Sequence, residues 1–183
     1  MSARAQWTAL IGCVAGLVTL LAAVATADND GLSRLKVSRA GAGAPMPSFQ
    51  LTTLDGKVIE SSGLTGKVLV LNFWATWCGP CKEEMPALDR LSRRFAEQDV
   101  AVLTITNDPE RRGIEHFMKQ VGSTLPVLLD EQRDVSLAFM VRGLPTTVFV
   151  GKNGAILGRA VGPRAWDSAE AVGLIQSLRE GRP

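Results

Sequence analysis

Apolar and polar positions along this chain alternate between short hydrophobic runs and longer amphipathic stretches. Lys67 to Ala75 is a nearly continuous apolar run, typical of a strand that is covered on both faces of a sheet. Cys78 to Phe95 places apolar residues at helical spacing, with Pro86 expected to kink the helix. Further strands are predicted at 49–53, 58–61, 100–106, 126–129, 146–150 and 155–161, and further helices at 109–121, around 135–139 and at 164–178. Strands that alternate with helices before a terminal hairpin predict an α/β sandwich with a mixed central sheet.

The N-terminal part follows a different pattern. An uncharged stretch of about 19 residues follows Arg4 and ends in Ala25-Thr26-Ala27, a small-residue cleavage signal. We therefore expect residues 1–27 to be a secretory signal peptide or, if uncleaved, a membrane anchor. Residues 28–47 are rich in glycine, alanine and proline and predict a linker, so the folded domain should span residues 48–183. In either case this domain faces an oxidising compartment.

The composition is that of an ordinary globular protein with one added apolar segment. The chain has 183 residues, 46% of them hydrophobic and 21% charged, with a net charge of +2. A charge so close to neutral gives no reason to expect nucleic acid as a partner. Of the three cysteines, Cys13 lies in the predicted leader, so the exported domain holds one pair, Cys78 and Cys81.

This cysteine pair is the chemical centre of the sequence. Trp77-Cys78-Gly79-Pro80-Cys81 follows a predicted strand and opens a predicted helix, the arrangement used for reversible thiol–disulfide exchange. A disulfide that encloses two residues constrains the unfolded chain little, so the pair indicates chemistry rather than a stabilising cross-link. A zinc site would need a second Cys/His pair, which the sequence lacks, and we expect neither a metal nor another cofactor.

The two cysteines have different expected roles. Cys78 is at a helix N-terminus, where free backbone N–H groups and the helix dipole favour the thiolate, so it should attack. Cys81 lies one turn inside the helix, and it should resolve the mixed disulfide and close the Cys78–Cys81 disulfide.

Two motifs identify a family resemblance. Residues 73–81, Phe-Trp-Ala-Thr-Trp-Cys-Gly-Pro-Cys, resemble the active-site signature of thioredoxin, and residues 141–146, Val-Arg-Gly-Leu-Pro-Thr, resemble its cis-proline loop. The leader, an extra hairpin before the first core strand and a long segment between Thr106 and Val141 make the chain more similar to the exported TlpA/ResA-like branch. The resemblance implies a thioredoxin-like three-layer sandwich with a mixed central sheet and an extra N-terminal hairpin.

The resemblance also implies a proton acceptor. Thioredoxin carries a buried aspartate where this chain has Asn72, which cannot take a proton. The TlpA/ResA-like branch carries a glutamate at the position of Glu84, so Glu84 is the expected acceptor for the proton of Cys81. The alternative is that Lys82, Glu83 and Glu84 form only a solvated first turn.

The remaining site residues are expected to bind the substrate. The resemblance implies that Pro145 is cis and that the backbone of Leu144 pairs with an extended substrate segment. Trp77 should form an apolar rim around the cysteines, with Gly79 and Pro80 completing the substrate-binding surface.

The expected function is that of a thiol:disulfide oxidoreductase that reduces selected proteins in the bacterial periplasm. The resemblance implies protein thiol or disulfide substrates, such as apocytochrome c or a copper-site assembly factor, and a membrane-embedded thiol carrier as electron donor. A copper metallochaperone is one alternative, although its histidine could only be His116. A peroxiredoxin-like peroxidase would need Pro-x-x-x-Thr-x-x-Cys, and this chain has Leu71 and Ala75 at the first two positions.

Overall fold

The structure is a computed structural model that describes residues 31–41 and 43–182, so the predicted leader at residues 1–27 lies outside the described residues. Its strands are β1 (Ser38–Arg39), β2 (Gln50–Thr53), β3 (Val58–Glu60), β4 (Val68–Trp74), β5 (Val100–Thr106), β6 (Val127–Leu129), β7 (Thr146–Val150) and β8 (Ile156–Val161). Its helices are α2 (Gly31–Arg34), the 3-10 helix η1 (Ser61–Leu64), α3 (Gly79–Arg94), α4 (Arg111–Val121), α5 (Asp134–Ala138) and α6 (Ala169–Arg179). Within residues 31–41 and 43–182, no helix is both long and apolar enough to cross a bilayer.

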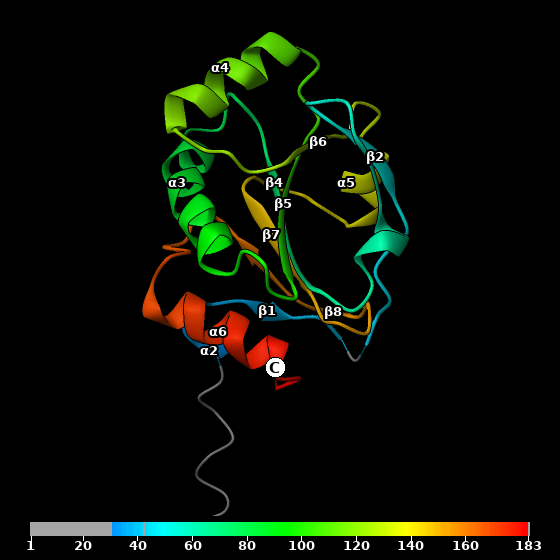
Figure 1. The fold of residues 1–183 in the computed structure, drawn as a ribbon, viewed down its shortest axis with the longest axis vertical. Coiled ribbons are helices and arrows are strands. Elements are labelled where there is room, and N and C mark those ends of the chain that lie inside the picture. The colour runs from blue at the N-terminus through cyan, green and yellow to red at the C-terminus, as the bar shows by residue number, and fades with distance from the viewer. Residues whose placement is uncertain (1–30, 42, 183) are drawn as a thin grey trace, which may run out of the picture. The chain divides into compact units, whose positions relative to one another are not determined.

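The strands described form one mixed sheet in the order β1-β8-β7-β4-β5-β6-β2-β3 (Figure 1). The central strand β4 pairs in parallel with β5 and antiparallel with β7. The hairpin β2–β3, predicted before the first core strand, adds to the edge of the sheet at β6. The mixed sheet and its added hairpin confirm the predicted architecture.

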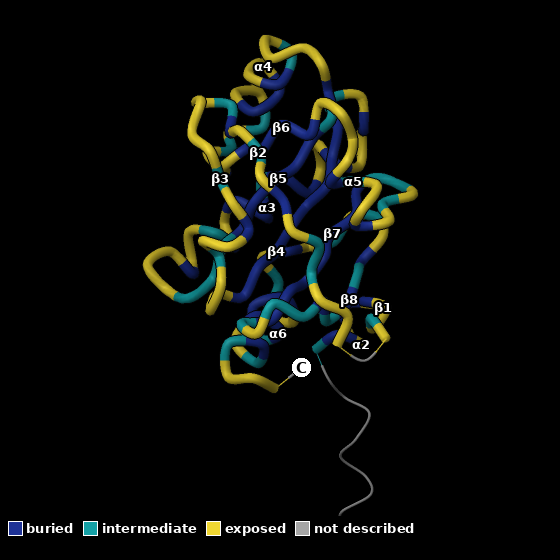
Figure 2. The backbone as a smooth tube through the Cα atoms, turned by 90° about the vertical axis from the view of Figure 1, so that its right-hand side faces the viewer, coloured by how far each residue is buried: buried dark blue, intermediate teal, exposed yellow. Residues whose placement is uncertain are grey.

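The side chains of β4 divide the core into two layers. Val70 and Trp74 belong to the core shared with α3, α4 and α6, whereas Leu71 and Phe73 belong to the core on the other face, with α5. Figure 2 shows that the central strands are buried along most of their length. Because successive side chains of a strand point to opposite faces, Asn72 lies on the same face as Val70 and Trp74, beneath α3. The register of β4 therefore places the polar side chain of Asn72 against α3, the helix that begins at the cysteines.

The segment expected to be a linker, residues 28–47, is folded where it is described. Leu32 in α2 is fully buried, and β1 pairs with β8 through Ser38 opposite Arg159. The compact unit therefore begins at Gly31 rather than at Ser48. The apolar residues of α2 and of the turn after it fill the core beside α6. The prediction missed this because the glycine-rich stretch that follows them is typical of a linker.

The last helix is shorter than its periodicity predicted. Helix α6 begins at Ala169, five residues after the expected start at Arg164, and Ser168 caps it by accepting a hydrogen bond from the Ala171 amide at 3.2 Å. Residues 163–168 form an irregular segment in which Trp166 is almost completely buried. This segment runs back towards α3 and becomes part of the site described below.

Candidate active site

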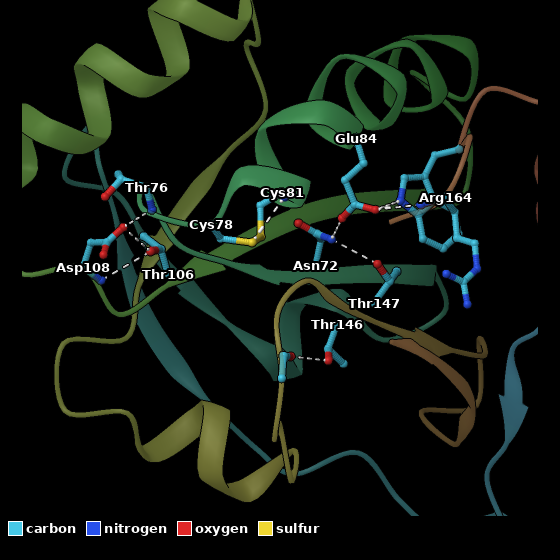
Figure 3. The surroundings of a disulfide bond; sticks show 12 residues. Asn72, Thr76, Cys78, Cys81, Glu84, Thr106, Asp108, Thr146, Thr147 and Arg164 are labelled. Atoms are coloured by element: carbon cyan, nitrogen blue, oxygen red, sulfur yellow. Dashed lines mark hydrogen bonds between the residues drawn. A yellow bond between two sulfur atoms is a disulfide. The ribbon is translucent and has the colours of Figure 1, made fainter. Parts of the chain in front are cut away.

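The two cysteines lie at the start of α3, just after the short loop that follows β4. Cys78 is the N-cap of α3, and its Sγ accepts a hydrogen bond from the Cys81 amide at 3.3 Å. The pair forms a disulfide with the two Cα atoms 5.3 Å apart (Figure 3). Cys78 is 6% exposed and Cys81 is fully buried, so Cys81 is the more protected of the two sulfurs. The helix N-terminus therefore lies against the sulfur that a substrate can reach first.

A groove of about 480 Å³ opens beside the disulfide and brings most of the predicted substrate-binding residues together. It is lined by Trp77, Cys78, Gly79, Pro80 and Leu144, among others. Trp77 is 75% exposed, as expected for an apolar rim.

The peptide bond between Leu144 and Pro145 is cis, as predicted. The backbone N–H and C=O of Leu144 form no hydrogen bond with another residue in the described part of the chain. Both groups are therefore available to pair with an extended segment lying in the groove.

Glu84 lies inside α3 and is 2% exposed (Figure 3). Its Oε2 accepts hydrogen bonds from Trp166 Nε1 at 2.8 Å and from the Arg164 amide at 3.1 Å. Its Oε1 accepts one from Asn72 Nδ2 at 2.8 Å. Burial raises the pKa of Glu84, because the ionised carboxylate loses its hydration, and these hydrogen bonds oppose the shift. The alternative of a solvated first turn is therefore wrong for Glu84, whereas Lys82 and Glu83 are exposed as that alternative requires.

Asn72 stands between Glu84 and the cysteines. Its amide nitrogen donates to Glu84 and also to Thr147 Oγ1 at 3.0 Å. Its amide oxygen is buried without a hydrogen-bond partner in the described residues, and in Figure 3 it faces the side of the disulfide. No hydrogen bond within residues 31–41 and 43–182 joins Glu84 directly to Cys81. Asn72 is therefore the residue that contacts Glu84 on the side of the cysteines.

Several residues of the site were not found from the sequence. Asn72 and Glu84 form a buried polar cluster. Three residues that lie 75 to 82 positions further along the chain contact it, namely Thr147, Arg164 and Trp166. No motif marks them, because each contributes one donor or acceptor whose role depends on the fold.

A second carboxylate fixes the loop that leads to the cysteines. Asp108 Oδ2 accepts hydrogen bonds from the Thr76 amide at 2.6 Å and from Thr106 Oγ1 at 3.2 Å. Asp108 is buried just after β5, the parallel neighbour of β4. It therefore ties the ends of the two strands together beside the start of α3.

The described residues contain no group of three or more His, Cys, Asp and Glu side chains that could hold a metal ion. His116 is exposed on α4, and it does not line the groove beside the disulfide.

Comparisons with known proteins agree with this geometry. The sequence profile of the AhpC/TSA family matches residues 42–158. The thiol-disulfide oxidoreductase ResA of a Bacillus cereus strain is 32% identical over 136 residues, which cover 74% of this chain and 78% of that protein. The ResA of Bacillus subtilis (strain 168) is 38% identical over 115 residues, covering 63% of this chain and 64% of that protein. The crystal structure of a thiol:disulfide interchange protein of the thioredoxin family from Chlorobium tepidum TLS matches with a TM-score of 0.67 at 28% identity, covering 76% of this chain and 99% of that one.

Proposed function

The chain belongs to the AhpC/TSA family as a thioredoxin-like, ResA-like thiol–disulfide oxidoreductase, and we propose that it reduces disulfide bonds in selected exported proteins. One observation carries this proposal. Cys78 faces an open groove at the N-terminus of α3, while Cys81 is fully buried behind it. An accessible thiol that attacks and a protected thiol that resolves are what a two-step exchange requires.

The reaction begins with the reduced dithiol. The Cys78 thiolate attacks one sulfur of a substrate disulfide, so that the Cys78–substrate bond forms and the first substrate thiolate leaves. Cys81 loses its proton and attacks Cys78 Sγ, which forms the Cys78–Cys81 bond and releases the second substrate thiolate. Two electrons pass to the substrate, and the protein ends in the disulfide form described above.

Glu84 accepts the proton of Cys81 in the second step. Its raised pKa brings it closer to neutrality, where a carboxylate is an effective base. Because Asn72 lies between the two groups and cannot itself be protonated, the proton crosses through one water molecule beside the Asn72 amide. The unpartnered Asn72 Oδ1 accepts a hydrogen bond from that water or from the Cys81 thiol.

Export and electron supply complete the proposal. The apolar stretch before residue 28 is a signal peptide or a membrane anchor, and the folded domain works in the periplasm. A reductant in that oxidising compartment has to be regenerated, and a membrane-embedded thiol carrier supplies the electrons. The substrates are cysteine pairs that must be reduced before a group is attached, as in apocytochrome c or a copper-site assembly factor.

The two alternatives lack supporting side chains. A peroxidase site would use Leu71 and Ala75, which are completely buried and carry no polar group. A copper site would rest on Cys78 and Cys81 alone, since the described residues offer no third ligand among histidine, cysteine and carboxylate side chains.

Trapping tests the proposal. In the Cys81→Ser variant of the full chain the second step is blocked, so covalent complexes between Cys78 and its substrates should accumulate in the source cell. Mass spectrometry after acid quenching should identify partners that are released by reductant. The Cys78→Ser/Cys81→Ser double variant is the control and should trap none. Equal recovery of reductant-sensitive partners from both variants would contradict the proposed cycle.

A further inference from the structure

The groove beside the disulfide carries a net positive charge. Arg133 and Arg142 line it, and no aspartate or glutamate does. Neither arginine forms an ion pair or a side-chain hydrogen bond with another residue in the described part of the chain, although several other arginines there are paired with carboxylates. Two unpaired guanidinium groups at the edge of a reactive disulfide leave a site that an anionic group can fill.

Arg133 is placed there by an unusual backbone. It precedes α5 with a φ of 65°, in the left-handed region that side chains other than glycine rarely adopt. Asp130 is buried and accepts hydrogen bonds from the Val135 and Ser136 amides at 3.1 and 2.7 Å, and neither it nor the exposed Asp134 forms an ion pair with Arg133 in the described residues. The cap of α5 thus engages Asp130 and leaves Arg133 free at the groove.

One exposed apolar side chain, Trp77, lines the same groove, and others lie on nearby segments. Five large apolar side chains are exposed in the described residues, and Trp77, Leu137, Met140 and Val161 lie in or next to segments that line the groove. Val161 lies next to Gly143, which lines the groove. A Cβ built on Gly143 would lie 3.8 Å from Val161 Cγ1. Apolar contacts and positive charge therefore meet around one opening.

We propose that Arg133 and Arg142 select polypeptide substrates in which acidic side chains flank the reactive disulfide. This inference rests on the proposed reductase function. An aspartate or glutamate within a few residues of the substrate cysteine pairs with the guanidinium groups, while an apolar neighbour packs on Trp77. Each solvent-exposed pair contributes about a 1.4- to 5-fold gain, so the two together favour an acidic substrate by roughly 2- to 25-fold over a neutral one.

Three peptide disulfides test the selection. They are homodimers of one extended cysteine peptide whose flanking residues are glutamate, glutamine or lysine, and the fully reduced full-length protein is mixed with each. The second-order rate constant of reduction should follow the order glutamate, glutamine, lysine. The spread should shrink as salt rises from about 10 to about 500 mM, because ions screen exposed charges.

Variants assign the effect to the two arginines. In Arg133→Gln/Arg142→Gln the preference for the glutamate peptide should be lost, and in Arg133→Lys/Arg142→Lys most of it should remain. Arg112→Gln is the matched control, because Arg112 is exposed on α4 and does not line the groove. It should retain the wild-type preference.

A small uncharged disulfide, hydroxyethyl disulfide, separates this inference from the function beneath it. The wild type should reduce it, and for every variant the rate constant with each peptide is divided by the rate constant with this disulfide, so that a change in Cys78 reactivity does not count as selection. If the wild type fails to reduce it, the reductase function itself is wrong. If it is reduced while the three peptides react equally, or while the double glutamine variant keeps the preference, only the selection by Arg133 and Arg142 is overturned.

Discussion

Replacing Glu84 by glutamine should separate the two steps of the exchange reaction. Glutamine Oε1 can keep the hydrogen bonds from Trp166 and the Arg164 amide, so only the contact with Asn72 changes. At that contact the NH₂ group of the new glutamine would face the NH₂ group of Asn72. If the Asn72 amide rotates, its Oδ1, which has no partner in the wild type, accepts a hydrogen bond from the glutamine NH₂. The fold should therefore lose only about 1 kcal/mol.

The effect on chemistry should be much larger. Positioned general bases accelerate proton transfer by about 10²- to 10⁴-fold. Because Glu84 acts across Asn72 rather than in direct contact with Cys81, we expect the lower end, a loss of about 10²-fold in resolution of the mixed disulfide. Attack by Cys78 should change less than about 2-fold, since Glu84 lies on the far side of Asn72 from the groove.

Single-turnover kinetics measure both steps. Reduced protein is mixed with excess peptide disulfide, quenched with acid at successive times, and the mixed disulfide is quantified by mass spectrometry. In Glu84→Gln it should accumulate, whereas in Glu83→Gln, which removes the same charge from an exposed neighbour, it should not. If the Glu84→Gln variant resolves the mixed disulfide as fast as the wild type, Glu84 is not the base.

The raised pKa of Glu84 gives a second readout, in stability. The folded protein retains a proton that the unfolded chain releases near the ordinary pKa of 4.5. The free energy of unfolding contributed by Glu84 is therefore fully present below this value and is lost as pH rises to the raised folded pKa. Denaturant unfolding across this window should show the stability of Glu84→Gln improving relative to wild type as pH increases.

Three further outcomes follow from the structure. Gly158→Ala should lower the free energy of unfolding by roughly 1–3 kcal/mol in urea titrations, because its Cβ would lie 2.8 Å from Val37 Cγ1, next to the antiparallel pair of β1 and β8. Trp77→Ala should slow peptide reduction while changing the free energy of unfolding by less than about 0.5 kcal/mol, because the side chain is exposed. Asn72→Asp should raise the pKa of Glu84 further by like-charge repulsion, so stability should fall more steeply with rising pH than in the wild type.

The sequence was most informative where one local pattern fixes one element. The apolar run at β4 and the cysteine pair after it can be recognised from a few consecutive residues, without information from other parts of the chain. The N-terminal segment was misjudged because its glycine and proline content outweighed the three apolar positions Leu32, Leu35 and Val37. Such residues anchor a segment only if the rest of the protein offers a surface for them to pack on. Here that surface is formed by α6 and β8, far along the chain, so the segment's own sequence could not reveal it.

By itself the sequence determined the core strands, the helix that begins at the cysteines and the chemistry of the cysteine pair, because periodicity and CxxC spacing act over short stretches of chain. Only the tertiary structure decided the environment of Glu84. Burial sets its pKa, and the groups that hold it, Asn72 and Trp166, come from a strand before it and an irregular segment far after it. The position of Arg133 at the groove without an ion pair was likewise decided in three dimensions, because Asp130, three residues earlier, hydrogen-bonds to the first turn of α5 instead of pairing with it.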